Sequence, residues 1–244
     1  MTADVHADEA MQEPLLEAFA NAPVADLVLI AGDLTTLGEQ DQARILAEAC
    51  STLPAPAVCV LGNHDFHSGE EAELRAVLAE AGVVLLQGEA ARFDLDGTSV
   101  GVAGSKGFVG GFPDWELPNF GEPLLRGLYD ATTAESEGLE RALEEIADCD
   151  VRIAMLHYAP TASTLAGEPE MIWPFLGSQR LGHPILAARP DLVLHGHAHA
   201  GTFEGRIGDV PVLNVAVAVT GRMFTVVEIA RDGRDGRRAL RVVD

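Results

Sequence analysis

The stretch Asp191-Leu192-Val193-Leu194-His195-Gly196-His197-Ala198-His199 places three histidines directly after a short apolar run. Such a run predicts a buried strand, and Gly196 allows a sharp turn at its end. We expect His197 and His199 to point into the crevice beyond the strand ends, where open α/β folds place their ligands. Two neutral imidazoles there predict a site for zinc, iron or manganese. A histidine-rich surface turn is the alternative, and the rest of the chain decides between them.

Other apolar runs also end in residues that can bind metal. The runs at residues 26–31, 57–61 and 151–156 end at Gly32-Asp33, Gly62-Asn63-His64-Asp65 and His157, and Asp4-Val5-His6 opens the chain. Taken singly, Asp33 could cap a helix, Asn63 could fill a turn and His157 could be a core histidine. Because parallel strands share one carboxyl edge, these residues should converge, and together they favour a metal site.

Strands and helices alternate in the first half, which is the pattern of βαβ units. Helices are predicted at residues 8–20, 40–53, 70–81 and 133–147, strands at 26–31, 57–61, 83–86 and 151–156, and a hairpin at 92–102 around Asp96-Gly97. Residues 104–130 and 160–182 are predicted to be irregular. The later strands, at 201–207, 210–215, 224–229 and 240–243, have no predicted helix between them, which indicates an antiparallel second half. An Arg/Asp/Gly-rich turn is expected at 231–238.

The composition bounds the class of protein. With 244 residues, 48% of them hydrophobic, the chain can form one large or two small domains, and we predict a single α/β domain over residues 1–244. No apolar run approaches the ~20 residues of a bilayer span, and acids replace the bases of a secretory signal. We therefore expect a cytoplasmic protein without membrane association. Cys50, Cys59 and Cys149 lie among apolar neighbours, which indicates reduced core thiols.

The net charge of −22, from 38 acids and 16 bases, argues against broad nucleic-acid binding. Solubility or a salty cytoplasm also accounts for many of the acids. A small anionic substrate could still be drawn to bound metal ions. Lys106, which is the only lysine, Arg126 and Arg180 are candidates to hold a phosphate, although each is also explained as a surface charge. The sequence leaves the oligomeric state open.

Five blocks resemble, in order, the signature blocks of the calcineurin-like metallophosphoesterase superfamily: Asp4-x-His6, Gly32-Asp33, Gly62-Asn63-His64-Asp65, His157 and Gly196-His197-x-His199. The resemblance implies a four-layer α/β/β/α sandwich of two mixed sheets flanked by helices, with two divalent metal ions at the strand ends. One ion would be held by Asp4, His6, Asp33 and His199. The other would be held by Asp33, Asn63, His157 and His197, so that Asp33 would bridge the pair.

The implied activity is hydrolysis of a phosphoester, with a hydroxide shared by two ions ~3.5–4 Å apart as the nucleophile. The resemblance places His64 beside the phosphorus, where it would stabilise charge or protonate the leaving oxygen. Asp65 would orient His64. His195 is expected to support the site or the core rather than to bind metal. His67 and His183 lie outside the blocks and are expected at the surface.

Differences from known subtypes of the superfamily reduce the range of candidate substrates. Its protein serine/threonine phosphatases carry an Asp-Arg pair shortly after Gly-Asp, whereas this chain has Gly32-Asp33-Leu-Thr-Thr-Leu-Gly38, and Asp65 replaces their Glu. We therefore predict a bacterial-type enzyme for a small phosphodiester or phosphomonoester. The alternative is a non-catalytic metal-binding scaffold with the same fold. The presence of Asn63 and His64 argues against that alternative.

The start of the chain is short for this family. Only Met1-Thr2-Ala3 precede Asp4, and three residues span at most ~11 Å, less than a usual strand. We expect either a native chain that begins upstream with about five to eight apolar, β-branched residues or a fold without that central strand.

Overall fold

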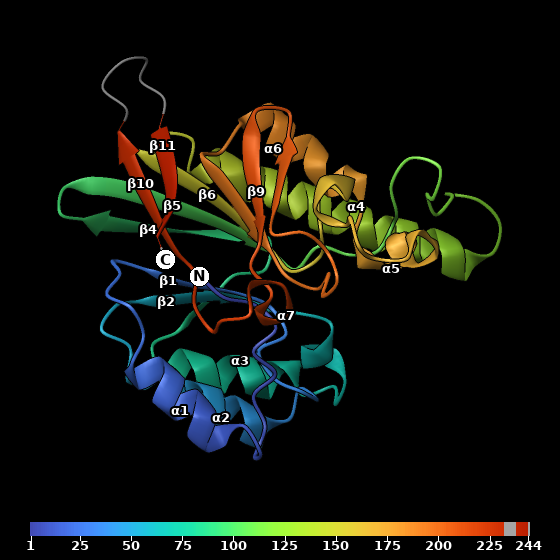
Figure 1. The fold of residues 1–244 in the computed structure, drawn as a ribbon. Helices are drawn as coiled ribbons and strands as arrows, with labels where there is room; N and C mark the ends of the chain where they lie inside the picture. The colour runs from blue at the N-terminus through green and yellow to red at the C-terminus, as the bar shows by residue number, and fades with distance from the viewer. Residues whose placement is uncertain (232–237, 244) are drawn as a thin grey trace.

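Two β-sheets pack face to face, and helices cover the outer face of each sheet (Figure 1). This arrangement is that of a computed structural model, which describes residues 1–231 and 238–243. The smaller sheet contains β1 Val28–Ala31, β2 Ala57–Val60 and β3 Val84–Leu85. The larger sheet contains β4 Glu89–Leu95, β5 Thr98–Ser105, β6 Val151–Leu156, β7 Leu192–His195, β8 Glu204–Ile207 and β9 Val210–Asn214. A hairpin pairs β10 Val226–Arg231 with β11 Arg238–Val243.

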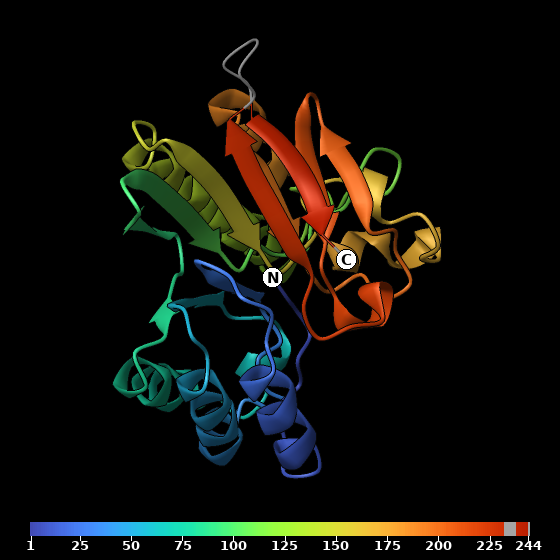
Figure 2. The ribbon, with the colours of Figure 1, turned by 60° about the vertical axis from the view of Figure 1, so that its left-hand side comes forward.

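The longer helices fall into two groups, which Figure 2 shows on opposite sides of the sheets. The smaller sheet is covered by α1 Gln12–Ala20, α2 Gln40–Ser51 and α3 Glu71–Glu80. The larger sheet is covered by α4 Pro123–Glu145 and α6 Gly182–Ala188. The short helices are η1 His64–Phe66, η2 Ala162–Thr164, η3 Glu170–Ile172, α5 Trp173–Leu176, η4 Gln179–Leu181 and α7 Val217–Thr220. None of the described helices has the length and apolar composition needed to cross a membrane.

Three apolar layers hold the sandwich together. In β1, Val28 and Ile30 pack towards α1 and α2, while Leu29 packs against the larger sheet. Successive side chains of a strand point to opposite faces, so a strand buried on both faces must be apolar throughout. A third layer, which includes Leu139 and Ile185, joins the larger sheet to α4 and α6. The expected α/β/β/α sandwich is therefore confirmed.

The strand order brings the metal-competent loops to one edge. The larger sheet runs β4-β5-β6-β7-β9-β8, with β5, β6, β7 and β9 parallel and the two edge strands antiparallel. In the smaller sheet β1, β2 and β3 are parallel. The carboxyl ends of β1, β2, β6 and β7 thus face the same side of the molecule. The parallel pairing of β9 with β7 also shows that the second half is not wholly antiparallel.

Several element boundaries differ from the sequence prediction. Helix α4 begins at Pro123 instead of residue 133, and its first turns are exposed. An exposed turn that contains Gly127 has no apolar periodicity to reveal it, although Pro123 at the first turn suits a helix start. Short helices occupy parts of 160–182, and α7 lies between β9 and β10, where no helix was expected. Most of the expected turn at 231–238 lies outside the described residues.

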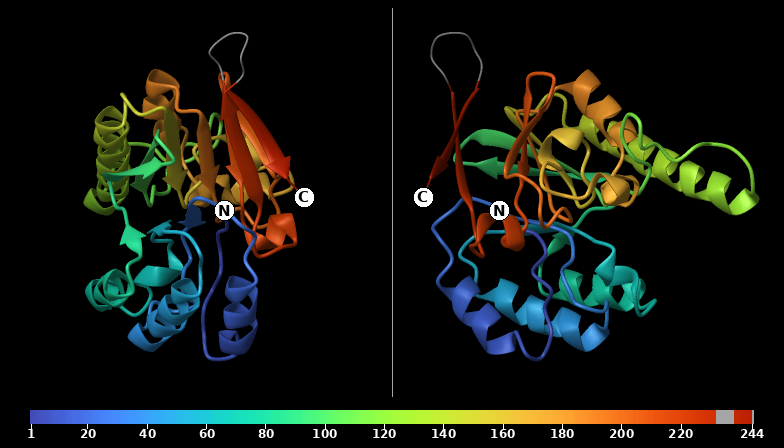
Figure 3. Two further views of the ribbon diagram at one scale, coloured as in Figure 1. Left: turned by 90° about the vertical axis from the view of Figure 1, so that its left-hand side faces the viewer. Right: turned by 45° about the vertical axis from the view of Figure 1, so that its right-hand side comes forward.

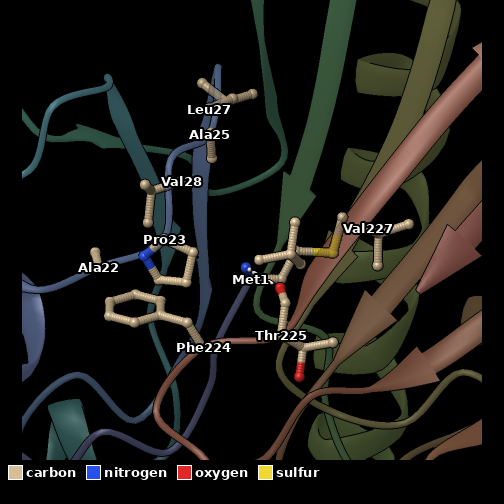
Figure 4. A pocket seen from close by; sticks show the side chains of 10 residues that line it. Met1, Ala22, Pro23, Ala25, Leu27, Val28, Phe224, Thr225 and Val227 are labelled. Carbon is tan, nitrogen blue, oxygen red and sulfur yellow. Dashed lines mark hydrogen bonds between the residues drawn. The ribbon is translucent and has the colours of Figure 1, made fainter. Parts of the chain in front are cut away.

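The first residues run along the free edge of β1. Thr2 bridges Ile30 in parallel, and Ala3 bridges Ala216. The Met1 amino group donates a hydrogen bond to the Thr225 carbonyl at 2.8 Å, and burial lowers its pKa to about 5. Figure 4 shows the Met1 side chain in a pocket that is also lined by Ala22, Pro23, Phe224 and Val227. Met1 is therefore packed between the segments that lead into β1 and β10.

Candidate metal centre

The site is assembled from loops that follow four strands. Asp33 follows β1, Asn63 follows β2, His157 follows β6, and His197 and His199 follow β7. The Asp4-x-His6 block lies alongside the first of these loops, because the Asp4 amide donates to the Gly32 carbonyl and the His6 amide donates to the Asp33 carbonyl, each at 3.0 Å. The structure thus brings together all seven residues predicted as metal ligands.

One cluster contains Asp4, His6 and His199, whose ligand atoms lie within 4.8 Å of one another. Nε2 of His199 is 2.9 Å from Oδ1 of Asp4. Burial raises the pKa of the Asp4 carboxyl, but the hydrogen bond and nearby charges of His199 and His157 outweigh it and leave the pKa below its usual value. The bond to Asp4 raises the pKa of His199. Asp4 is therefore held as an anion, which suits it to bind a cation together with His199.

A second cluster contains Asp33, His157 and His197. Nε2 of His157 lies 3.3 Å from Oδ1 of Asp33 and 3.0 Å from Oδ1 of Asn63. The other carboxylate oxygen of Asp33, Oδ2, is 3.8 Å from Nε2 of His6 in the first cluster. The two oxygens of Asp33 therefore face different clusters, an arrangement suited to a carboxylate that bridges two ions.

Backbone carbonyls determine which imidazole nitrogens face the centre. Nδ1 of His157 lies 3.0 Å from the Ala31 carbonyl, and Nε2 of His197 lies 3.1 Å from the Phe175 carbonyl. A backbone carbonyl only accepts, so these nitrogens are the donors in these contacts, and the other nitrogen of each ring is the candidate metal-binding atom. Burial lowers the pKa of His197 to about 3, so its ring is neutral near pH 7.

Four candidate ligands of the site have a strained backbone conformation. Asp4, His6, Asp33 and His197 have φ values of 58°, 48°, 47° and 68°, in the left-handed region that non-glycine residues rarely adopt. Such strain clusters at functional sites, where packing holds it. At Gly196, a Cβ would overlap the Asp4 carboxylate. The fixed set of carboxylate, imidazole and amide donors suits divalent manganese, iron or zinc.

His64 lies at the edge of both clusters. Its Nε2 is 4.0 Å from Oδ2 of Asp33, and its ring packs edge-on against that of His6 with centroids 4.6 Å apart. Nδ1 of His64 is 2.8 Å from the Thr36 carbonyl, which leaves Nε2 directed towards the centre. His6, Asp33 and His64 also form a group whose ligand atoms lie within 4.8 Å. The assignment of His64 as a catalytic residue outside the ligand set stays a prediction.

Asp65 is buried and holds two loops of the site together. Its carboxylate accepts hydrogen bonds from the amides of Leu34, Thr35 and Gly62 at 3.1, 2.9 and 2.8 Å, and from the Thr35 hydroxyl at 2.7 Å. Burial raises its pKa, and these hydrogen bonds oppose that effect. The sequence assigned Asp65 to orienting His64, but in the described contacts the Thr36 carbonyl bonds the His64 ring. Asp65 instead accepts hydrogen bonds from Leu34 and Thr35 and so stabilises the loop that carries Thr36.

The remaining histidines lie outside the clusters. His195 is buried, with Nε2 2.8 Å from the Thr164 hydroxyl and Nδ1 2.7 Å from the Gly196 carbonyl, and burial lowers its pKa to about 4. It supports the turn that carries His197. His67 and His183 are exposed, as expected from their absence in the signature blocks.

Two cations predicted to hold a phosphate are engaged within the fold. Lys106 is buried, with Nζ 3.7 Å from Oε1 of Glu135 and 4.4 Å from the Phe108 ring centroid. Arg180 donates to the Tyr129 carbonyl at 3.0 Å and to the Thr133 hydroxyl. These contacts disfavour a role for either side chain in holding a phosphate, which the sequence left open beside that of a surface charge.

The supporting groups that the sequence did not predict are mainly carbonyls. Ala31, Thr36 and Phe175 each present a main-chain oxygen to an imidazole of the site. Every residue has a carbonyl, so no residue type in the sequence marks these positions.

An α/β/β/α sandwich with such a cluster at its strand ends is the arrangement of metal-dependent phosphoester hydrolases. The chain belongs to the calcineurin-like phosphoesterase family, whose model matches residues 1–201. The resemblance found in the five sequence blocks is therefore confirmed.

Solved structures show the same fold at low sequence identity. The phosphopantetheinyl hydrolase from Mycobacterium tuberculosis is 14% identical, with a TM-score of 0.64 over 98% of this chain and 94% of that chain. A putative 5′-nucleotidase from Staphylococcus aureus is 17% identical, with a TM-score of 0.56 over 88% of this chain and 43% of that chain. No curated protein matches the sequence.

Proposed function

We propose that the protein hydrolyses a small phosphodiester or phosphomonoester with two divalent metal ions. One ion would be held by Asp4, His6, Asp33 and His199, and the other by Asp33, Asn63, His157 and His197. The observation that carries this proposal is the placement of Asp33, whose two oxygens lie 3.3 Å from His157 and 3.8 Å from His6. One carboxylate between two clusters is suited to a pair of ions rather than to a single ion.

The side chains around this pair have separable roles. Two ions held there would neutralise charge on the phosphoryl group and activate a water molecule for attack on phosphorus. His64 presents Nε2 to the same space, so it can stabilise developing charge or protonate the leaving oxygen. Asp65 is a positioning residue that fixes the loops carrying Asp33 and Asn63.

The substrate is proposed from charge and from the neighbours. A net charge of −22 disfavours a polyanionic substrate, while a metal pair attracts a small phosphate. The two named neighbours are a phosphopantetheinyl hydrolase and a putative 5′-nucleotidase, and their names support retaining both diesters and monoesters as candidates.

A metal titration tests the proposal. Metal-free protein would receive increasing Mn²⁺, with bis(p-nitrophenyl) phosphate and p-nitrophenyl phosphate as substrates. Turnover that rises to a plateau at two equivalents is the expected result. A plateau at one equivalent would reject the pair. Metal binding without turnover of any ester would favour the alternative, a non-catalytic scaffold, against which Asn63 and His64 in the site already argue. A screen with manganese present would then identify the substrate class, using cyclic nucleotides, dinucleotides, phospholipid head-group diesters and sugar phosphates.

We also propose a cytoplasmic location. Cys50, Cys59 and Cys149 are free and buried, and burial raises the pKa of the Cys50 thiol to about 12. Buried, unpaired thiols are typical of proteins from reducing compartments. Secretion of the native protein in an active form would contradict this proposal.

A further inference from the structure

Large apolar side chains are exposed mainly on two segments of the molecule. Ten are exposed among the described residues, and seven of these lie within residues 115–125 and 171–175. Phe120, Leu124 and Met171 are 78%, 79% and 72% exposed. A concentration of this kind marks a binding surface. We call it the apolar rim; its members are Trp115, Phe120, Leu124, Leu125, Met171, Ile172 and Phe175.

Ordered contacts join residues 110–112, just before the first segment, to residues 173–177 in and after the second. The Gly110 amide donates to the Pro174 carbonyl at 2.9 Å, and the Gly111 amide donates to the Gly177 carbonyl at 2.8 Å. The ring of Phe112 packs edge-on against Trp173, with centroids 6.4 Å apart. These contacts tie the chain that leads into the first segment to the second segment. Figure 1 and the right panel of Figure 3 show α5 lying between the sheet and the projecting N-terminal end of α4.

The apolar rim is continuous with the candidate metal centre. The carbonyl of Phe175 bonds Nε2 of His197 at 3.1 Å, while the Phe175 side chain is 58% exposed. A carboxylate oxygen of Glu168, at the start of the same segment, accepts from the Ala200 amide beside His199 at 2.7 Å. A group attached to a phosphate in the centre would thus meet the rim first at Phe175.

The charges around the rim disfavour two other occupants. Residues 112–130 and 168–178 contain six acids and one base, Arg126. An anionic bilayer would be repelled by these acids, and a second copy of the chain would bring its own net charge of −22. An uncharged apolar group would not be repelled by these acids.

We propose that the apolar rim binds an uncharged aliphatic ester group of the substrate, while the phosphate of the same molecule occupies the metal centre. This inference rests on the proposed function and adds the substrate class: phosphoesters with an extended apolar group. The group runs from Phe175 towards the N-terminal end of α4. Burial of its methylene groups against the rim favours long esters over short ones.

A chain-length series tests the proposal. The substrates are the methyl, butyl and octyl esters of p-nitrophenyl phosphate, with the full-length manganese-loaded protein. We expect kcat/KM for the octyl ester to exceed that for the methyl ester by at least about 10-fold, since even one methylene group can discriminate at that level. Combining Met171→Ser with Leu124→Ser should bring the ratio towards one. Leu186→Ser, which alters a 49% exposed side chain on α6, is the matched control and should keep the wild-type ratio.

The outcomes separate this proposal from the proposed function. The p-nitrophenyl group is the same in every substrate, so only the alkyl group changes. Equal kcat/KM values across the series, or a ratio that the double variant does not change, would overturn binding of an aliphatic group by the rim while hydrolysis stands. If no ester is hydrolysed, the proposed function fails. The rim is then tested by calorimetry, which compares the affinity of the protein for octyl phosphate with its affinity for methyl phosphate. Equal affinities would reject it. A flat series with rim-dependent binding to neutral phosphatidylcholine vesicles, or with a rim-dependent dimer, would assign the surface to a membrane or a second copy. Thermal melts monitored by circular dichroism would verify that each variant folds.

Discussion

Nδ1 of His64 lies 2.8 Å from the carbonyl oxygen of Thr36, and this contact fixes which nitrogen of the ring faces the candidate metal centre. The Thr36 hydroxyl is itself 3.0 Å from the His6 carbonyl and 3.1 Å from Oδ2 of Asp8, so the residue is anchored on both sides. A carbonyl accepts only, so Nδ1 must carry the proton. His64 therefore presents Nε2 to the candidate metal centre without needing a carboxylate partner.

His64→Ala should lower kcat by roughly 10²–10⁴-fold, the range for a lost general acid or charge stabiliser. The metal content should stay near the wild-type value, because the proposed ligand set does not include His64. Steady-state kinetics and elemental analysis of the same preparation would measure both. His67→Ala, at an exposed histidine close in sequence, serves as the control. A fall in metal content together with activity would show that His64 is a ligand, which its 4.0 Å distance from Asp33 also permits.

Asp33→Asn should abolish metal-dependent hydrolysis and reduce bound metal by more than the loss of any single-cluster ligand. The reason is that the Asp33 carboxylate faces both clusters, with Oδ1 towards His157 and Oδ2 towards His6. Asn63→Ala should lower the affinity for one of the two ions only. Titration of each metal-free variant with Mn²⁺ would give the stoichiometry, and Asp26→Asn near the start of β1 is a carboxylate control. Hydrolysis at wild-type rates in both variants would reject the site.

The strand ends of this fold were predictable because apolar runs and polar residues alternate sharply there. A strand buried on both faces, such as β1, has to be apolar throughout, and the first polar residue after it, Asp33, marks the edge of the sheet. The candidate ligands follow such runs or, like Asp4 and His6, pair with the loop that does. Their convergence could therefore be inferred from the sequence.

Other features could not be predicted, for two physical reasons. The first turns of α4 are exposed, so no packing imposes an apolar period there, and Gly127 weakens the helical pattern further. The roles of Thr36 and Phe175 depend on carbonyl oxygens, which are independent of residue type. The pairing of Lys106 with Glu135 joins residues from β5 and α4, and only the packing of the helix on the sheet brings them together.

Lys106→Met should destabilise the protein by about 3 kcal/mol, near the lower end of the range for breaking a buried ion pair. The loss arises because the Glu135 carboxyl loses its cationic partner, whose Nζ lies 3.7 Å away. Burial lowers the pKa of Lys106, and the charge of Glu135 opposes that shift, so the two groups depend on each other. Urea denaturation of the single variant and of the double variant with Glu135→Gln would measure the coupling.

The Lys106 double variant should recover part of the lost stability, because the glutamine can still interact with the Ser105 hydroxyl, which lies 2.6 Å from Oε2 of Glu135. Arg75→Met, at an exposed hydrogen bond to Gln87, is the control and should change stability little. Additive effects of the two changes would show that the pair is not coupled. A rise in KM without any loss of stability would instead restore Lys106 as a residue that contacts the substrate.

The stability of the metal-free protein should fall as the pH is lowered from 7 to 5, and His195 should account for about 2 kcal/mol of that fall. Burial lowers the pKa of His195 from 6.5 to about 4. Between these two values the unfolded chain binds a proton that the folded protein does not, so stability is lost as pH falls through this window. His195→Gln preserves a polar group beside the Thr164 hydroxyl and removes the titration. Urea denaturation at both pH values should give a smaller loss for His195→Gln, while His183→Gln, at an exposed histidine, should follow the wild type. The same loss in His195→Gln as in the wild type would contradict a neutral, buried His195.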